Sequence, residues 1–346
     1  MRPSQESAII VTNHGFQLDP RSVFIPVEIV FLILDNADPL GVVQFRMISF
    51  GAHKIVMKFM HDTYNTVTLI KRFFPSELAA EFQVLQQQTS LVVSGSSVLT
   101  FFYQSSFPDS DCDLYVHSHH CDQVIVFVLK AGYRLYHLMT SQNIESVFHT
   151  SKVSFYFCSN NYTLKTITGV HESVHHADEN LKVQVILCQE SPVDVLLGFH
   201  STVPMNIITH DYAIYLYPKA TFNLGVNFAK FDVHVPAVVG RHKYTSHGWT
   251  LIPNSKGQQD ADLQDVQRYI GDWYCWMIHL PALSPLPQSS SRILDHSWVL
   301  SYPKANAGYV TQYRLLSLST LSQAVCASSA VVEHWQDGMV KWYVFY

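Results

Sequence analysis

The chain has 346 residues, of which 48% are hydrophobic, 13% aromatic and 14% charged, and its formal net charge at pH 7 is −5. This composition is too apolar for an intrinsically disordered protein, and the length allows one large or two modest hydrophobic cores. Lysine and arginine form no cluster, so strong nucleic-acid binding is not expected, and no apolar run reaches the roughly 20 residues of a membrane span.

The N-terminal tail, residues 1–20, lacks the sustained apolar segment of a secretion signal. The six cysteines are scattered and contain no CxxC pair, so we expect reduced and mostly buried thiols. Together these observations predict an intracellular protein, cytoplasmic or nuclear.

Two or three short amphipathic helices are predicted between residues 23 and 57. Pro26 and Pro39 each fit the first position of a helix, and Asp38 can cap the second helix. Apolar side chains at helical spacing form one face, made of Ile25, Ile29, Leu32, Leu40, Val43 and Met47. This face could dock a partner protein as exposed anchors or pack on the rest of the chain as an N-terminal cap, and the pattern leaves both open.

Helices and strands alternate through the middle of the chain. Helices are expected at residues 76–88, from 96 onward and at 121–130, the last closed by Gly132, with strands at 90–94 and from 112. Strand composition recurs at 152–158, 162–170 and 181–188, and the last has the clearest β-branched alternation. We therefore expect an α+β (α/β) domain built on a mixed sheet flanked by helices, from about residue 91 to 222.

The C-terminal third gives weaker signals. A helix is expected at residues 260–270, followed by a loop rich in proline and serine from Leu280. We divide the chain into a tail (1–20), a helical segment (21–70), an α+β domain (71–250) and a C-terminal α+β extension (251–346).

The stretch SGSSVLTFFYQSSFPDSDCDLYV, residues 94–116, is the strongest candidate for a functional site. In a strand, Asp111 and Asp113 share a face, and two carboxylates on one face can hold Mg²⁺ together with substrate phosphates. Gly95 would let a phosphate approach the backbone, and Ser96 would cap a helix whose free N–H groups favour an anion. The alternative is that a polar loop entering a strand carries two acids by chance.

The order of a Gly-Ser pair, a helix and an Asp-x-Asp on the next strand resembles the hallmark region of the nucleotidyltransferase fold of the DNA polymerase beta superfamily. More closely, the chain resembles proteins of mushroom-forming fungi, with which it shares RFFP, SGS, PDSD, GFHSTVPMNIIT, LYPKATF and a late KY…GW. These blocks cover roughly residues 72–251.

This resemblance implies a nucleoside triphosphate bound with Mg²⁺. It assigns phosphate contact to Gly95 and Ser96, metal binding and catalysis to Asp111 and Asp113, and a third carboxylate to a neighbouring strand. In the strand LKVQVILC the matching position is Gln184, which carries no charge, and Asp194 and Asp211 are possible substitutes. The missing acid implies a one-metal site or a pseudoenzyme that binds nucleotide without turnover.

The segment FIPVEIVFLILDNADPLGVVQFRMIS, residues 24–49, resembles an F-box. The resemblance implies that residues 21–57 contact an adaptor subunit of a cullin ubiquitin ligase. The alternative function is therefore a non-catalytic adaptor or interaction protein.

Histidines suggest three further sites. HESVH, residues 171–175, matches the HExxH motif of zinc peptidases, but it lies between predicted strands and not in a helix, so a surface loop is preferred. HSHH, residues 117–120, is interpreted as a solvated turn, although it could tune the metal or contact phosphate. His200 and Asn206 lie in a polar island and are candidate substrate-binding residues, with a buried histidine that organises a turn as the alternative for His200.

Overall fold

The structure is a computed structural model, and it describes residues 10–12, 15–17, 25–37, 39–103, 107, 110–140, 167–230, 235–252, 267–285, 292–301 and 310–315. The strand predicted at residues 152–158 lies outside this range. So do the start of the strand predicted at 162–170 and most of the helix predicted at 260–270.

Helices dominate the first third of the chain and strands the remainder. The helices are α1 (Val27–Asp35), α2 (Pro39–Met47), α3 (Phe50–Thr63), α4 (Thr66–Ile70), α5 (Ala79–Thr89), α6 (Ser96–Tyr103), α7 (Cys121–Lys130), α9 (Pro192–Leu197) and α10 (Val235–Ser246), with the short helices η1 (Ser76–Leu78), η2 (Ser118–His120), η3 (Lys219–Asn223) and η4 (Arg292–Asp295). The strands are β1 (Ile10–Thr12), β2 (Gly15–Gln17), β3 (Ile25–Pro26), β4 (Val92–Ser94), β5 (Cys112–His117), β6 (Tyr133–Thr140), β7 (Ile167–His175), β8 (Lys182–Cys188), β9 (Asn206–Ile208), β10 (Tyr212–Tyr215), β11 (Val226–Phe228), β12 (Thr250–Ile252), β13 (Gln267–Tyr269), β14 (Trp276–His279), β15 (His296–Ser301) and β16 (Val310–Leu315).

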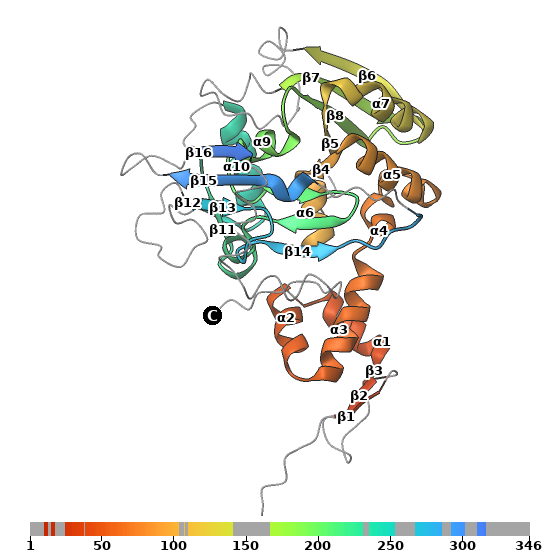
Figure 1. Ribbon diagram of the computed structural model, residues 1–346, viewed down its shortest axis with the longest axis vertical. Coiled ribbons are helices and arrows are strands. Elements are labelled where there is room, and N and C mark those ends of the chain that lie inside the picture. The colour runs from red at the N-terminus through yellow and green to blue at the C-terminus, as the bar shows by residue number, and fades with distance from the viewer. Residues whose placement is uncertain are drawn as a thin grey trace, which may run out of the picture.

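The central element is an eight-stranded sheet in the order β14-β10-β9-β4-β5-β8-β7-β6 (Figure 1). Strands β5 and β8 run parallel and the other neighbours run antiparallel, so the sheet is mixed. Helix α6 connects β4 to β5, and α7 follows β5 directly and ends before Gly132, whose φ is +93°. The predicted mixed sheet with flanking helices is confirmed.

Each face of the sheet has its own hydrophobic core, because side chains alternate along the strands. On one face, Leu114 and Val185 pack with side chains of α3, α5, α6 and α7. On the other face, Tyr115 and Ile186 pack with α9 and with strand β15. The Asp-x-Asp stretch lies at the beginning of a strand that is central to both cores.

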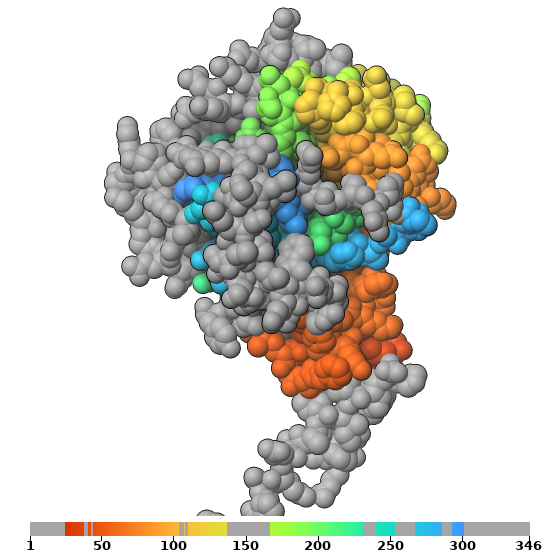
Figure 2. All heavy atoms as spheres, in the orientation of Figure 1, coloured from red at the N-terminus to blue at the C-terminus, as the bar shows by residue number. Residues whose placement is uncertain are grey.

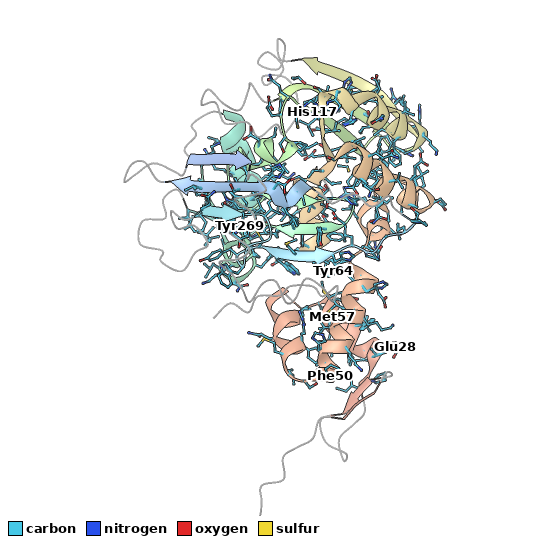
Figure 3. All side chains as sticks on the ribbon, viewed as in Figure 1. Glu28, Phe50, Met57, Tyr64, His117 and Tyr269 are labelled. Carbon is cyan, nitrogen blue, oxygen red and sulfur yellow. The ribbon has the colours of Figure 1, made fainter. Side chains whose placement is uncertain are left out.

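The N-terminal helices α1, α2 and α3 form a lobe that extends from the rest of the molecule (Figures 1 and 2). Figure 3 shows Tyr64, which follows α3, where the lobe meets the body. Its hydroxyl donates to the carbonyl of Phe102 at 3.5 Å, and its ring lies 5.3 Å from Phe101 and 6.3 Å from Trp276, centroid to centroid. The inner side of the lobe therefore shares one core with the sheet.

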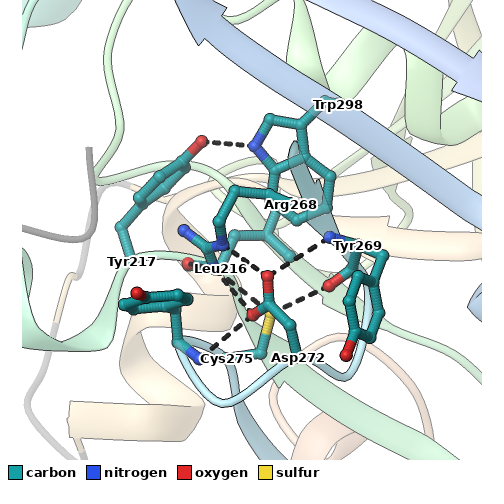
Figure 4. Close-up of polar contacts among 8 residues, drawn as sticks. Leu216, Tyr217, Arg268, Tyr269, Asp272, Cys275 and Trp298 are labelled. Carbon is teal, nitrogen blue, oxygen red and sulfur yellow. Dashed lines mark hydrogen bonds and ion pairs between the residues drawn. The ribbon is translucent and has the colours of Figure 1, made fainter. Parts of the chain in front are cut away.

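The C-terminal strands β13, β15 and β16 form a separate three-stranded sheet. Residues 267–269 were expected to end a helix, but they form β13 and pair with β15, so that prediction is wrong for them. The reason is tertiary: Arg268 is buried and forms a buried ion pair with Asp272, and it donates to the carbonyl of Leu216 at 3.0 Å (Figure 4). These contacts outweigh a local helical pattern.

Among the described residues, no helix is both long and apolar enough to cross a membrane.

Candidate functional site

The Gly-Ser turn and the two aspartates meet at one end of the central strands. Strand β4 pairs antiparallel with β5, and Ser94 lies opposite Asp113. Asp111 immediately precedes β5, while Cys112 and Leu114 are buried in the core. The expectation that the two acids share one face is thus confirmed, and the beginning of α6 lies beside them.

Gly95 fits tightly against the second aspartate. Its φ is +87°, a conformation that other residues rarely adopt, and a Cβ atom on Gly95 would overlap the Oδ2 atom of Asp113. Glycine is required here for two reasons, backbone conformation and the proximity of a carboxylate. The predicted role of Gly95 in phosphate binding stays a prediction.

Asn206 holds the turn from the neighbouring strand β9. Its side-chain Nδ2 donates to the carbonyl of Gly95 at 3.2 Å, and the Ser94 hydroxyl donates to the Asn206 backbone carbonyl at 2.6 Å. The side chains of Ser94 and Asn206 are both buried. In this geometry Asn206 positions the Gly-Ser turn, and direct contact with a substrate stays a prediction.

The carboxylates are held where ionisation is unfavourable. Burial, reinforced by the charge of Asp111, raises the pKa of Asp113 to about 8, against an ordinary value of 3.8. Burial also raises the pKa of Asp111, although Lys182, Lys243 and Arg72 oppose that shift. Within the described part of the chain, no hydrogen bond reaches the Asp113 carboxylate. A cation bound between the two acids would relieve both burial and repulsion.

Gln184 faces the two acids. It lies opposite Asp113 in the parallel pairing of β5 with β8, and its Nε2 atom lies 3.4 Å from Oδ2 of Asp111. The position at which a third carboxylate is expected therefore belongs to the site, and an amide occupies it. Asp194 follows the far end of β8, and Asp211 follows the far end of β9, so both lie at the opposite ends of these strands.

Sequence reasoning missed a buried acid, Glu172. The segment HESVH was expected to be a surface loop, but it forms the end of β7, and Glu172 lies opposite Gln184 with 5% of its surface exposed. The loop prediction is wrong, and the extended backbone also excludes the helix that a zinc peptidase motif needs. The spacing of Val170, Glu172 and Val174 was the available signal for a strand. Lys182 pairs with Glu172 at 3.6 Å.

Sequence reasoning also missed Lys243, on helix α10. Its Nζ atom donates to the Ser96 hydroxyl at 3.0 Å, although the two residues are 147 positions apart in the chain. Its charge opposes the rise in pKa of both Asp111 and Asp113, so the ammonium group lies near the acids as well as the turn. No local motif indicated this lysine.

The remaining histidine candidates lie elsewhere. His200 is fully buried, and its Nδ1 atom forms a hydrogen bond of 2.7 Å with the hydroxyl of Ser201. Burial, with the charge of Arg241, lowers its pKa well below the usual value. This environment favours the alternative of a histidine that organises a turn. His117 ends β5, so the HSHH segment lies at the other end of this strand from the acids.

No family model, no curated protein and no solved structure matches this chain. The function therefore has to be argued from the site itself.

Proposed function

We propose that the protein binds a nucleoside triphosphate with Mg²⁺ at Gly95, Ser96, Asp111 and Asp113, in the manner of a nucleotidyltransferase. The observation that carries the proposal is the contact between Gly95 and the Asp113 carboxylate. It brings the Gly-Ser turn, which suits a phosphate, next to the acid pair, which suits the metal that a triphosphate carries.

The donor set fits Mg²⁺. This ion commonly takes one or two protein carboxylates and completes its coordination with water and phosphate oxygens. Within the described residues, no three His, Cys, Asp or Glu side chains converge closely enough to hold a metal ion by themselves. Asp111 and Asp113 would hold the ion only together with a substrate, and the bound ion would supply charge stabilisation to the phosphates.

Gln184 limits what the site can do chemically. An amide cannot accept a proton from an attacking hydroxyl at neutral pH, nor contribute charge to a second metal ion. Glu172 is one strand further away and is paired with Lys182. We therefore propose nucleotide binding as the function, and we expect nucleotidyl transfer to be slow or absent.

Calorimetric titration tests the proposal with ATP, GTP, CTP and UTP, each with and without Mg²⁺. The Asp111→Asn, Asp113→Asn double variant should lose Mg²⁺-dependent binding. Asp194→Asn is a matched control, because burial raises the pKa of this carboxyl as well but it lies at the other end of the sheet. An absence of nucleotide binding to the wild-type protein under every condition would retire the proposal.

A second candidate function, that of an F-box-type adaptor, is favoured by a specific observation. The N-terminal lobe exposes several large apolar side chains that its own core leaves uncovered, namely Ile29, Leu32, Ile33, Met47, Ile48 and Phe50. Phe50 is 75% exposed, and Figure 3 shows it at the end of the lobe away from the sheet. Exposed apolar patches of this kind are typical of protein-binding surfaces.

Direct binding to a purified cullin-ligase adaptor subunit tests this second candidate. The Leu32→Glu, Ile33→Glu double variant should abolish binding while the thermal stability of the protein is retained, because both side chains are exposed. Val126→Glu on α7 is the control, since Val126 is 64% exposed on a helix of the main body. Equal binding by both variants, or no binding by the wild-type protein, would remove the adaptor function.

A further inference from the structure

Three cations lie close enough to Asp111 to affect its pKa, and they differ in what they contact. Arg72 donates to the carbonyl of Phe107 at 2.7 Å and to the hydroxyl of Ser110 at 2.8 Å, so it fixes the loop before the acids. Lys182 pairs with Glu172. Each of these two cations therefore has a defined structural partner.

Lys243 is different, because its described partner is neutral. The ammonium group donates to the Ser96 hydroxyl at 3.0 Å, and it makes no ion pair with any described residue. It is only partly buried, so it can be reached from solvent. A lysine whose main contact is a serine hydroxyl retains most of its capacity to bind an anion.

The surroundings of Ser96 strengthen this asymmetry. Ser96 is the first residue of α6, so Lys243 lies at the helix end where unpaired N–H groups concentrate positive charge. An ammonium group at this end of a helix is unfavourable unless negative charge is close. Asp111 and Asp113 supply some of that charge, but a metal ion bound to them would cancel it. The helix end and Lys243 would then face an anion together.

We propose that Lys243 binds the phosphate chain of the substrate, on the Gly-Ser side of the site, while Asp111 and Asp113 hold the metal. This inference rests on the proposed function and deepens it, because it identifies the substrate class as a polyphosphate ester carried with a metal ion. It also makes α10 a part of the site, although this helix follows the sheet strands that carry the other residues.

Two probes separate the anion from the metal. Binding of Mn²⁺ alone reports on the acids, and binding of inorganic tripolyphosphate in the presence of Ca²⁺ reports on the anion subsite. Both are measured by calorimetry on the full-length wild-type protein and on Lys243→Met, Lys243→Arg and Lys182→Met. Lys182→Met is the matched control, because it removes a cation that also acts on Asp111 but whose described partner is Glu172.

Lys243→Met should weaken tripolyphosphate binding at least tenfold, roughly the contribution of one charge-assisted hydrogen bond. Lys243→Arg should recover most of that loss, and Lys182→Met should bind within about threefold of the wild type, since a remaining charge effect is screened. Mn²⁺ should bind Lys243→Met at least as tightly as the wild type, because a repelling charge has gone. A general structural defect would instead weaken both probes.

The outcomes distinguish this inference from the proposed function. Tripolyphosphate binding that is equal in wild type and Lys243→Met, or absent from a wild type that still binds Mn²⁺, would overturn the role of Lys243 and leave the metal site standing. Tripolyphosphate binding that depends on Lys243 without any Mn²⁺ binding would support the anion subsite and overturn the metal site. A wild type that binds neither probe would overturn both.

Discussion

Two clusters of charged side chains in this chain differ in how completely they are satisfied. In the cluster around Arg268, the Oδ2 atom of Asp272 accepts from Arg268 and from the N–H of Tyr269 (Figure 4). Its Oδ1 atom accepts from Arg268 and from the N–H of Tyr274. At the other cluster, no hydrogen bond from a described residue reaches the Asp113 carboxylate.

The difference indicates two purposes. A fully satisfied buried ion pair stabilises one arrangement of the chain and has no capacity left for a ligand. Two repelling carboxylates with raised pKa values cost stability, and that cost persists only where something outside the chain offsets it or where function requires it. The first cluster joins the C-terminal sheet to the body, and the second is the candidate binding site.

The largest effect is expected from breaking the satisfied cluster. Arg268→Met leaves Asp272 buried without its counter-ion and should lower the free energy of unfolding by about 3 to 5 kcal/mol. Urea unfolding measures the loss. Arg134→Met is the control, because its pair with Glu179 is exposed and should matter by less than about 1 kcal/mol. If both variants unfold at the same urea concentration, the Arg268 cluster does not stabilise the fold.

The opposite sign is expected at the candidate site. The folded-state pKa of Asp113, about 8, exceeds its ordinary value of 3.8, so the folded wild type keeps a proton that the unfolded chain releases. Its contribution to stability is complete below about pH 4 and is lost as pH rises to about 8.

Asp113→Asn removes this pH dependence. With metal chelated at pH 8, the variant should be more stable than the wild type by about 2 kcal/mol, a value reduced from the full shift because Asp113 is partly accessible to solvent. Urea unfolding across a pH series measures the effect. A difference between variant and wild type that stays constant from pH 4 to pH 8 would contradict the expectation.

Restoring the missing acid sharpens the comparison further. Gln184→Glu places a third carboxylate beside Asp111 and replaces a donor by an acceptor, so the metal-free protein should lose about 1 to 2 kcal/mol. The same change should tighten Mn²⁺ binding roughly tenfold, because a negative charge has been added near the ion. Gln184→Met, which removes the amide without adding charge, is the control. Unchanged Mn²⁺ affinity in Gln184→Glu would mean that this side chain does not face the metal.

The smallest effect is expected from two glycines compared with each other. Gly95→Ala and Gly248→Ala both force a positive φ on alanine, but only at Gly95 would the new Cβ meet another group, the Asp113 carboxylate. Gly95→Ala should therefore cost about 1 kcal/mol more than Gly248→Ala. It should also weaken Mn²⁺ binding several-fold, while Gly248→Ala leaves it unchanged. Equal stability and equal Mn²⁺ binding would argue against close contact at Gly95.

Local patterns predicted much of the fold. The β-branched alternation at residues 181–188 identified β8, and the helices at 76–88 and 121–130 were placed near their observed bounds. The helix expected at residues 260–270 failed at its end, where Arg268 belongs to a strand and pairs with Asp272. The histidine-rich polar composition of HESVH concealed a strand end, because burial of Glu172 depends on neighbouring strands and not on its own segment.

The sequence by itself determined which residues could bind a metal and a phosphate. A period of two places Asp111 and Asp113 on one face, and a glycine before a helix start permits a tight turn. Only the tertiary structure decided what surrounds them. Gln184 faces the acids because β5 and β8 pair in parallel, and Lys243 reaches Ser96 across 147 residues of chain. Such contacts follow from strand register and helix packing over long distances, which local sequence patterns do not encode.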